Sequence, residues 1–557
     1  MNFNIKSASF RYLDAATENS VVSFCPLRRL SRAGWRFCSH SAQARQVLHI
    51  MNSSDITLRR RARLATFLLG TTLVAGCAVG PNYHRPAAPT LRNYTTTPLP
   101  SSTASTSGPG GNAQHFVIGQ KIVGEWWTLY HSRPLDMLIR TALANNPSLK
   151  SAQDTLLAAR DSARAAEGGF FPSISGSFQA ERVRSGLGTT GIGSAGAGVT
   201  YSLRNASVAV SYAPDVFGAT RRQVESLRAQ SEQQRYALEA AYLLLTANVV
   251  TASVTEASLT AQIAATERII RAEKRLLDIL DRQVALGGIP ETNAITQRTQ
   301  LAQTEATLPP LRKQLAQTRD QLAAYEGLPP SRFHAADFTL ADLALPESLP
   351  VSLPSTLVQQ RPDIREAAAV LHQDTALVGV ATANMLPQIT LSAGIGHEAL
   401  DGQALFAPQT LLWNLAAGIT QPFFEGGTLF YKRRAAVATM KAAAETYENT
   451  VVLAFQNVAD TLEALHYDAI ALAADTAAEH DAKRSLDLIE RQFRLGGVPY
   501  TSVLTAEQTY ESAAITRIKA TAQRYADTAA LFQALGGGWW HRHDVKKQVE
   551  TCCGVLP

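Results

Sequence analysis

RQVALGGIP (residues 282–290) returns 491 − 282 = 209 residues later as RQFRLGGVP (residues 491–499). Two adjacent glycines end a helix with residues that tolerate positive φ, and a proline that follows closely begins the next helix. The pattern therefore predicts two helical hairpins with the same turn. The residues of these turns are Gly287, Gly288 and Pro290 in the first copy and Gly496, Gly497 and Pro499 in the second.

Other landmarks repeat in the same order, which indicates two copies of one supersecondary unit. Pro172 matches Pro387, and 387 − 172 = 215, so the second copy lacks 215 − 209 = 6 residues. A Gly-rich stretch at 185–198 lies in this interval of the first copy and is expected to be an exposed loop. The expected parts are a first repeat at 134–327, a Pro-rich connector at 328–354 and a second repeat at 355–537.

Each repeat contains one long stretch without proline, at 218–286 and at 427–495. As continuous helices these stretches would each extend for about 100 Å at 1.5 Å per residue. In the first stretch the apolar heptad positions are interrupted by Glu256, Thr266 and Glu273. Interrupted, Ala-rich seams favour helices that lie side by side in a sheath over a two-stranded coiled coil.

A return helix is expected after each turn, at 291–325 and at 500–535. Pro309 and Pro310 lie inside the first of these helices. Because proline lacks a backbone N–H and collides with the preceding turn, this pair should break or kink the helix.

Four segments alternate apolar and polar residues with a period of two, two in each repeat. Their apolar residues are Ile174, Gly176, Phe178 and Ala180; Ala206, Val208, Val210 and Tyr212; Ile389, Leu391, Ala393 and Ile395; and Trp413, Leu415, Ala417 and Ile419. About ten residues per segment fits a transmembrane β-strand that is apolar toward lipid and polar toward a lumen. A soluble antiparallel sheet would show the same period, but these strands have no second layer to cover them.

Four strands are too few to close a membrane barrel, since such barrels have at least about eight. Several chains must therefore contribute to one barrel; two chains would give eight strands and three would give twelve. The predicted fold is mostly α with a small β part. Two tandem repeats of long antiparallel helices pack side by side in a sheath, and four transmembrane strands per chain contribute to a shared β-barrel.

The N-terminal region has the order of a secretory signal. Four arginines at 59–63 are followed by the apolar stretch 64–74 and by Ala75-Gly76-Cys77. A basic region, a short apolar core and small residues describe a signal peptide. We expect an extension at 1–50 that is not part of the protein proper, a signal peptide at 51–76, a tether and periplasmic wrap at 77–133 and a tail at 538–557.

The charge and the cysteines agree with export. Residues 1–76 hold eleven Lys or Arg and three Asp or Glu, so the rest of the chain carries a net charge of 6 − 8 = −2. This removes the main compositional argument for nucleic-acid binding. Positions 78–551 contain no cysteine, as suits an oxidising compartment. No pattern assembles a nucleophile, a base and an orienting group, and none spells a metal site, so no enzyme activity, metal or cofactor is expected.

Four stretches carry a resemblance to a known family: Cys77 to Tyr83, Trp126-Trp127 through Pro147, Arg361 to Arg365, and Leu535 to Trp539. They resemble the TolC-like outer-membrane efflux factors, in particular the lipoprotein branch called the NodT family. The likeness spans roughly residues 77 to 540. Each motif alone is weak, but four in order on a twofold repeat are specific.

The resemblance implies a homotrimer in the bacterial outer membrane with a twelve-stranded β-barrel, four strands from each chain. It implies that the helices form a hollow α-barrel that extends through the periplasm. It implies a covalent lipid on Cys77, and a periplasmic adaptor and an inner-membrane efflux transporter as partners. The chain would be a passive exit duct for drugs or toxic solutes. The alternatives are the outer channel of a type I protein-secretion system and a coiled-coil lipoprotein scaffold without a pore.

In relatives, the residues just after the second turn line a constriction, which corresponds to 496–508 here. The candidate gate residues are Tyr500, Thr505, Glu507 and Gln508. Relatives often have aspartates near Val498 and Thr505; this chain has neither and offers Glu507 instead. A ring of Glu507 carboxyls is the hypothesis, and a solvated charge on a helix face is the alternative.

Overall fold

The structure is a computed structural model, and it describes residues 78–91, 93–98, 100–184, 200–334 and 339–542. All of these belong to the compact unit Val74–Pro557. The expected extension and signal peptide, Cys77, the Gly-rich loop and most of the tail lie outside the described residues.

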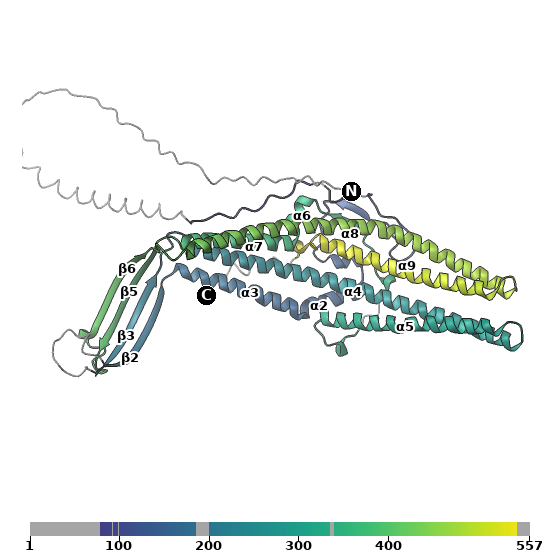
Figure 1. Cartoon of the computed structure of the whole chain (residues 1–557), viewed down its shortest axis with the longest axis horizontal. Helices are drawn as coiled ribbons and strands as arrows, with labels where there is room; N and C mark the ends of the chain where they lie inside the picture. Colours follow the sequence, from purple (N-terminus) through teal and green to yellow (C-terminus); the bar gives the residue numbers. More distant parts are fainter. Residues whose placement is uncertain (1–77, 92, 99, 185–199, 335–338, 543–557) are drawn as a thin grey trace, which may run out of the picture. The chain divides into compact units, whose positions relative to one another are not determined.

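The described elements follow the predicted order of helix, strand, strand, long helix and return helix, twice (Figure 1). The helices are α2 (Arg133–Asn145), α3 (Pro147–Glu167), α4 (Ala219–Ala285), α5 (Glu291–Tyr325), α6 (Pro354–Gln360), α7 (Pro362–Ala383), α8 (Thr428–Arg494) and α9 (Tyr500–Ala534). The strands are β1 (His115–Ile118), β2 (Ser173–Arg184), β3 (Thr200–Tyr212), β4 (Ser348–Val351), β5 (Gln388–Ala399) and β6 (Leu411–Thr420), and a 3-10 turn, η1, spans Trp126–Tyr130.

The two copies match in length as well as in order. Helices α4 and α8 have 67 residues each, and α5 and α9 have 35 each. Both long helices begin directly after a glycine in the left-handed conformation, Gly218 (φ 82°) and Gly427 (φ 84°). The predicted helices are confirmed to within one residue at each end.

The break that the two prolines could have caused in the first return helix is absent. Helix α5 continues through Pro309 and Pro310 without a break. Both prolines lie on the exposed side of the helix, where water can satisfy the carbonyls that lose their N–H partners. The Thr307 hydroxyl also donates to the carbonyl of Thr304 within the same turn (2.7 Å).

Matching side chains join the two ends of each repeat. Asn146, just before α3, donates through Nδ2 to the carbonyl of Tyr325 at the end of α5 (2.9 Å). Arg361, just before α7, donates through Nη1 to the carbonyl of Ala534 at the end of α9 (2.8 Å) and pairs with Asp363 (2.6 Å). The Asn-Asn-Pro and Arg-Pro-Asp motifs therefore have the same structural role. Each donates a hydrogen bond to a carbonyl that would otherwise lack a partner at a helix end.

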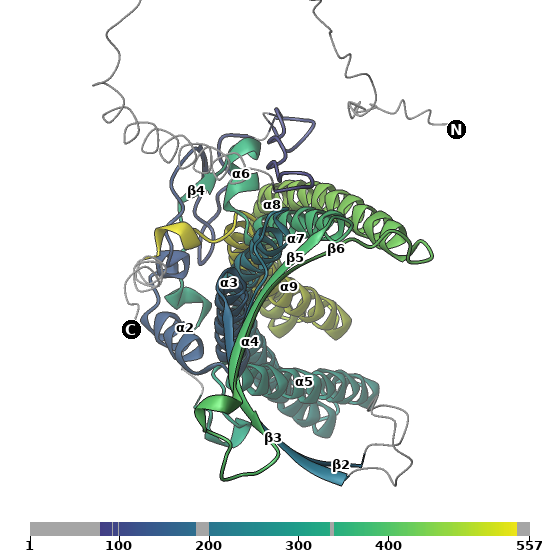
Figure 2. The same ribbon diagram turned by 90° about the vertical axis from the view of Figure 1, so that its left-hand side faces the viewer.

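The four long strands form one antiparallel sheet in the order β2-β3-β5-β6, so the two β-pairs join edge to edge. Figure 2 shows this sheet as a curved arc. Cross-strand partners place like residues on the same face: Ile174 faces Val210, Val208 faces Ile395, and Ile395 faces Trp413. The opposite face carries Ser177 beside Ser207, whose hydroxyls are 3.0 Å apart. The predicted alternation is confirmed.

No described element covers the apolar face of the sheet. Its large side chains are exposed, among them Ile174 (72 %), Trp413 (75 %) and Leu415 (78 %). A water-soluble sheet buries its apolar face against a second layer, and an exposed apolar surface of this kind marks a contact with a partner or a membrane.

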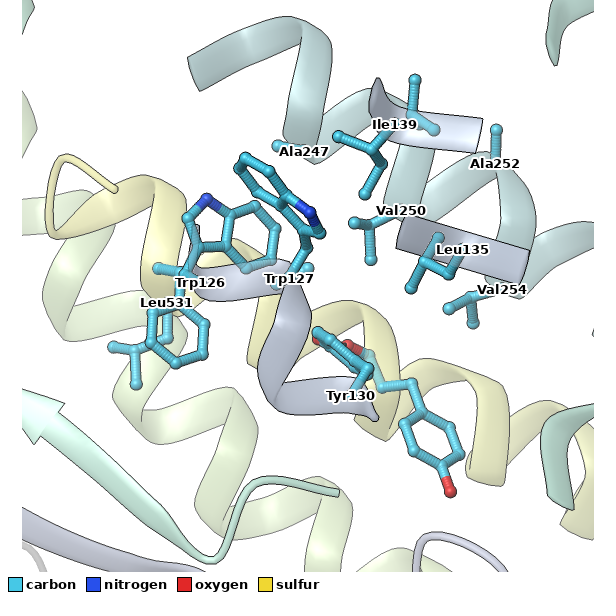
Figure 3. Close-up of a cluster of buried hydrophobic side chains, with 14 of the residues drawn as sticks. Trp126, Trp127, Tyr130, Leu135, Ile139, Ala247, Val250, Ala252, Val254 and Leu531 are labelled. Atoms are coloured by element: carbon cyan, nitrogen blue, oxygen red, sulfur yellow. Dashed lines mark hydrogen bonds between the residues drawn. The ribbon is translucent and has the colours of Figure 1, made fainter. Parts of the chain in front are cut away.

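The main core lies where η1 and α2 meet α4 and α9. Figure 3 shows Trp126, Trp127 and Tyr130 of η1 gathered with side chains of α2, α4 and α9. Trp126 stacks on Phe532 (centroids 5.3 Å apart), and Tyr130 donates to the carbonyl of Tyr525 (2.8 Å). The Trp-Trp motif is thus a packing anchor of the helices.

The sequence did not reveal the small parallel sheet formed by β1 and β4. This sheet joins the expected N-terminal wrap to the expected Pro-rich connector. Each strand has only four residues, too few for a periodic signal, and β4 contains Pro350.

The polar residues that interrupt the apolar heptads of α4 take part in its packing. Glu256, Thr266 and Glu273 are all buried, and Glu256 pairs with Arg319 of α5 (2.7 Å). Among the described helices, α4 alone has a stretch long and apolar enough to cross a membrane by composition, and 61 % of that stretch is buried within the chain. We therefore interpret α4 as a core helix.

Candidate functional site

The two predicted tip turns have the same geometry. In the first, the Gly287 N–H donates to the carbonyl of Val284 (2.9 Å) and the Gly288 N–H to that of Gln283 (2.8 Å). In the second, Gly496 and Gly497 donate to the carbonyls of Phe493 and Gln492 at the same two distances. This pair of bonds is the Schellman motif, which requires positive φ at its first glycine, and Gly287 (72°) and Gly496 (75°) provide it.

The prolines of the turns lie one residue before the return helices. Pro290 and Pro499 precede Glu291 and Tyr500, and each accepts the first backbone bond of its helix through its carbonyl, from Asn293 and Ser502. A fixed φ near −65° prepares the chain for the helical turn that follows.

A small apolar cluster holds the two hairpins together near these turns. Leu280 of α4 and Ala294 of α5 are buried against Tyr500 and Val503 of α9. The Tyr500 ring also meets Phe493 edge-on (centroids 6.0 Å apart). Farther from the tip, Gln508 donates through Nε2 to Oε1 of Gln300 on α5 (2.7 Å). The structure thus brings the two repeats side by side at their tips.

The candidate gate residues point in different directions. Tyr500 and Glu507 are buried within the chain, while Thr505 and Gln508 are exposed. Thr505 lines a shallow groove between α8 and α9 together with Ile489. A ring of Glu507 carboxyls would form only between copies of the chain, so it stays a prediction. Within this chain Glu507 is only 7 % exposed.

Glu507 belongs to a buried polar group that sequence reasoning did not find. Glu273 of α4 is 1 % exposed, and its Oε1 accepts from the Thr304 hydroxyl of α5 (3.0 Å). The other carboxylate oxygen of Glu273 has no partner among the described residues, nor has Oε2 of Glu507 or the Tyr500 hydroxyl. The interrupted heptad was a signal in the sequence for Glu273, and it was interpreted as favouring helices that lie side by side in a sheath.

Burial, together with the neighbouring carboxyls of Glu273, Glu490 and Glu511, raises the pKa of Glu507 to about 8. Burial also raises the pKa of Glu273 and of Glu511. Like charges that share a buried site disfavour the ionised form. Glu507 is therefore mostly protonated at neutral pH, which keeps most of the negative charge off this buried side chain.

A second arrangement clamps residues 79–82, just after Cys77, against the start of α4. Arg222 is 4 % exposed and donates through Nε to the carbonyl of Val79 (3.2 Å) and through Nη2 to Oδ1 of Asn82 (2.6 Å). Its Nη1 pairs with Glu225 (2.7 Å). The Val79 N–H donates to the carbonyl of Phe217 (3.1 Å), which follows β3. We call these contacts the N-terminal clamp.

The clamp depends on small residues at its crossing points. A Cβ at Gly80 would lie 2.5 Å from Cα of Gly379 on α7, and one at Gly379 would lie 2.8 Å from the Arg222 side chain. Tyr83 then stacks on His372 of α7 (centroids 4.4 Å apart). The chain after Cys77 is therefore seated between α4 and α7 at the end of each helix that adjoins the strands.

No group of three or more His, Cys, Asp or Glu within the described ranges is placed to hold a metal ion.

Comparison with known proteins agrees with this geometry. The family model described as "Outer membrane efflux protein" matches residues 138–328 and 353–537, more than half of the chain. The chain is 27 % identical over 484 residues to the toluene efflux pump outer membrane protein TtgC of Pseudomonas putida, covering 86 % of this chain and 95 % of that protein.

It is also 26 % identical over 495 residues to Nodulation protein T of Rhizobium leguminosarum bv. viciae, covering 86 % of this chain and 94 % of that protein. Among solved structures, the outer-membrane channel OprN aligns with a TM-score of 0.75 at 24 % identity over 83 % of this chain and all of that chain. This structural likeness bears on the fold.

Proposed function

The chain belongs to the outer membrane efflux protein family and is an outer-membrane efflux channel with a periplasmic helical extension; from this premise we propose that it is a trimeric, passive exit duct. Members of this family are transport proteins, which agrees with the expectation that the chain is not an enzyme. Energy would come from an inner-membrane transporter, and a periplasmic adaptor would join the two.

The single observation that carries the proposal is the sheet with one bare apolar face and one polar face. Four strands leave two free edges, at β2 and β6. A β-sheet that spans a membrane must close into a barrel, because an unpaired strand edge in lipid leaves backbone groups without hydrogen bonds. Three chains joined edge to edge would close twelve strands and turn the polar face toward a shared lumen.

Conductance in planar lipid bilayers tests the proposal. We expect discrete channel openings from the purified full-length protein. Crosslinking in mild detergent should give products of up to three chains. A coiled-coil scaffold without a pore would give a soluble or membrane-bound oligomer with no conductance, and that result would overturn the proposal.

We infer small molecules as the cargo. The relatives are named for toluene efflux, pyoverdine export and cation efflux, which differ widely in chemistry. A duct that serves such different compounds in its relatives need not bind any of them tightly, so selectivity would reside in the inner-membrane transporter.

The N-terminal clamp supports Cys77 as a lipid anchor. The Cα atom of Ala78 lies 2.7 Å from the position that a Cβ atom at Gly218 would occupy. The residue after Cys77 is therefore held at the junction of β3 and α4. This junction lies at the end of the strands that adjoins the helices. An acyl chain on Cys77 would enter the leaflet of the outer membrane that faces the periplasm, at the base of the barrel.

Replacing Cys77 by Ala should abolish labelling with radioactive palmitate. The folded trimer should still fractionate with the outer membrane, because a closed barrel holds a protein in the bilayer far more firmly than one lipid chain does. Cys552→Ala is the matched control and should label like the unaltered protein. Continued labelling of the Cys77→Ala protein would contradict the assignment of the anchor.

A further inference from the structure

Charged residues are segregated between the two faces of the four-stranded sheet. The pairing places Glu181 and Glu398 on the polar face, where Glu398 accepts a hydrogen bond from Nδ2 of Asn205 (3.1 Å). Arg182, Arg184 and Arg204 all lie on the opposite, apolar face. The described strands carry no other Asp, Glu, Lys or Arg.

The three arginines gather at one end of the apolar face. Arg204 is opposite Ala180, and Arg182 is opposite Ser202, so Arg182 and Arg204 are diagonal neighbours about 7–8 Å apart at Cα. Arg184 is two residues farther along the same strand, toward the end of the sheet away from the helices. Toward the helices the same face carries Ile174, Ile389 and other uncharged residues instead.

The side chains are placed to meet a ligand. Arg182 and Arg184 are exposed on the face that no described element covers. Arg204 is half-buried; its Nη1 donates to the carbonyl of Leu400 (3.5 Å), and its guanidinium lies against Gly402. The contact with Gly402 holds one of the three guanidinium groups in place at the sheet's rim.

Membrane energetics limit what can neutralise these cations. An arginine on the lipid face of a barrel is strongly destabilising at the bilayer midplane and close to neutral at the interface. The cluster therefore belongs at the head-group level, where phosphate oxygens can accept charge-assisted and bidentate bonds from guanidinium groups. The cluster lies at the end of the sheet away from the helices, so the head groups that it meets are those of the leaflet that faces the exterior.

We propose that Arg182, Arg184 and Arg204 form a binding site for the phosphates of a diphosphorylated glycolipid, the lipid A type of head group found in that leaflet. The inference rests on the proposed function, since it requires the sheet to span the outer membrane. A trimer would carry three such sites around its barrel.

The test is lipid binding by the purified full-length trimer in a non-ionic detergent, followed by native mass spectrometry. The unaltered protein should bind diphosphoryl lipid A more tightly than the same lipid without phosphates, by about tenfold or more. The variant R182Q/R184Q, which changes two exposed residues, should lose most of that preference. Adding R204Q should remove the rest.

The matched control is R268Q/R271Q/R275Q, which removes three exposed arginines of α4 far from the sheet and should bind lipid as the unaltered protein does. Equal binding of diphosphoryl lipid A by the unaltered protein and by R182Q/R184Q would overturn the proposal. Equal binding of phosphatidylglycerol would overturn the choice of glycolipid. Conductance recorded on the same preparations separates the two failures, since a protein that conducts but shows no arginine-dependent binding contradicts this inference alone.

Discussion

Leu415→Lys should prevent most of the protein from reaching its folded form in the outer membrane. Leu415 lies in the middle of β6, is 78 % exposed in the single chain and faces Ala393 on the apolar side of the sheet. A lysine on the lipid face near the midplane costs about 2–4 kcal/mol per chain. Because three chains share one barrel, the total destabilisation of the trimer would be three times as large.

Ala416→Lys is the matched control, because its side chain is the next along the strand and points to the polar face beside Ser392. A lysine there would meet the water of the lumen and should leave assembly close to normal. The measurement is the fraction of heat-modifiable trimer in isolated outer membranes. If the two variants assembled equally well, the assignment of the apolar face to lipid would be wrong.

The stability of the helical tip should fall as the pH rises from about 4.5 to about 8. Glu507 has its pKa raised to about 8 in the folded protein, whereas a free Glu carboxyl titrates near 4.5. A group whose pKa is raised by folding stabilises the fold fully below its unfolded value, and this contribution is lost as the pH rises through the folded value. At 1.36 kcal/mol per pKa unit, the free energy of unfolding should fall by up to about 5 kcal/mol.

Glu507→Gln should remove most of this dependence, because the amide resembles the protonated acid in shape and carries no charge at any pH. The remaining slope would come from other carboxyls whose pKa values burial raises, among them Glu273, Glu511 and Asp527. The measurement is the Tm of the purified protein at pH 5, 7 and 9. Glu448→Gln, an exposed residue of α8, is the control and should keep the full slope. An unchanged slope in the Glu507→Gln protein would contradict the buried, protonated carboxyl.

The local features of the fold could be predicted from the sequence because they rest on short-range chemistry. A Gly-Gly-x-Pro turn determines its own hydrogen bonds, and the tip at Gly496 has the geometry expected of it. Alternation along β5 places Leu391 and Ile395 on one face whatever the strand pairs with. The need for several chains also followed from strand number alone.

The tertiary structure decided what each buried polar residue does. From the sequence, Glu273 was an interruption in a heptad and Glu507 a candidate for a channel ring. Only the crossing of α4, α5 and α9 brings them into one buried group, and burial together with the neighbouring carboxyls raises their pKa values.

The N-terminal clamp could not be found in the sequence for the same reason. Arg222 lies 140 positions from Asn82, and no periodicity links residues so far apart. The nearness of Arg204 to Arg182 likewise became visible only with the register between β2 and β3, because these neighbours on one face come from different strands. Local geometry is set by bonds between neighbours in sequence, whereas charge environments are set by neighbours in space.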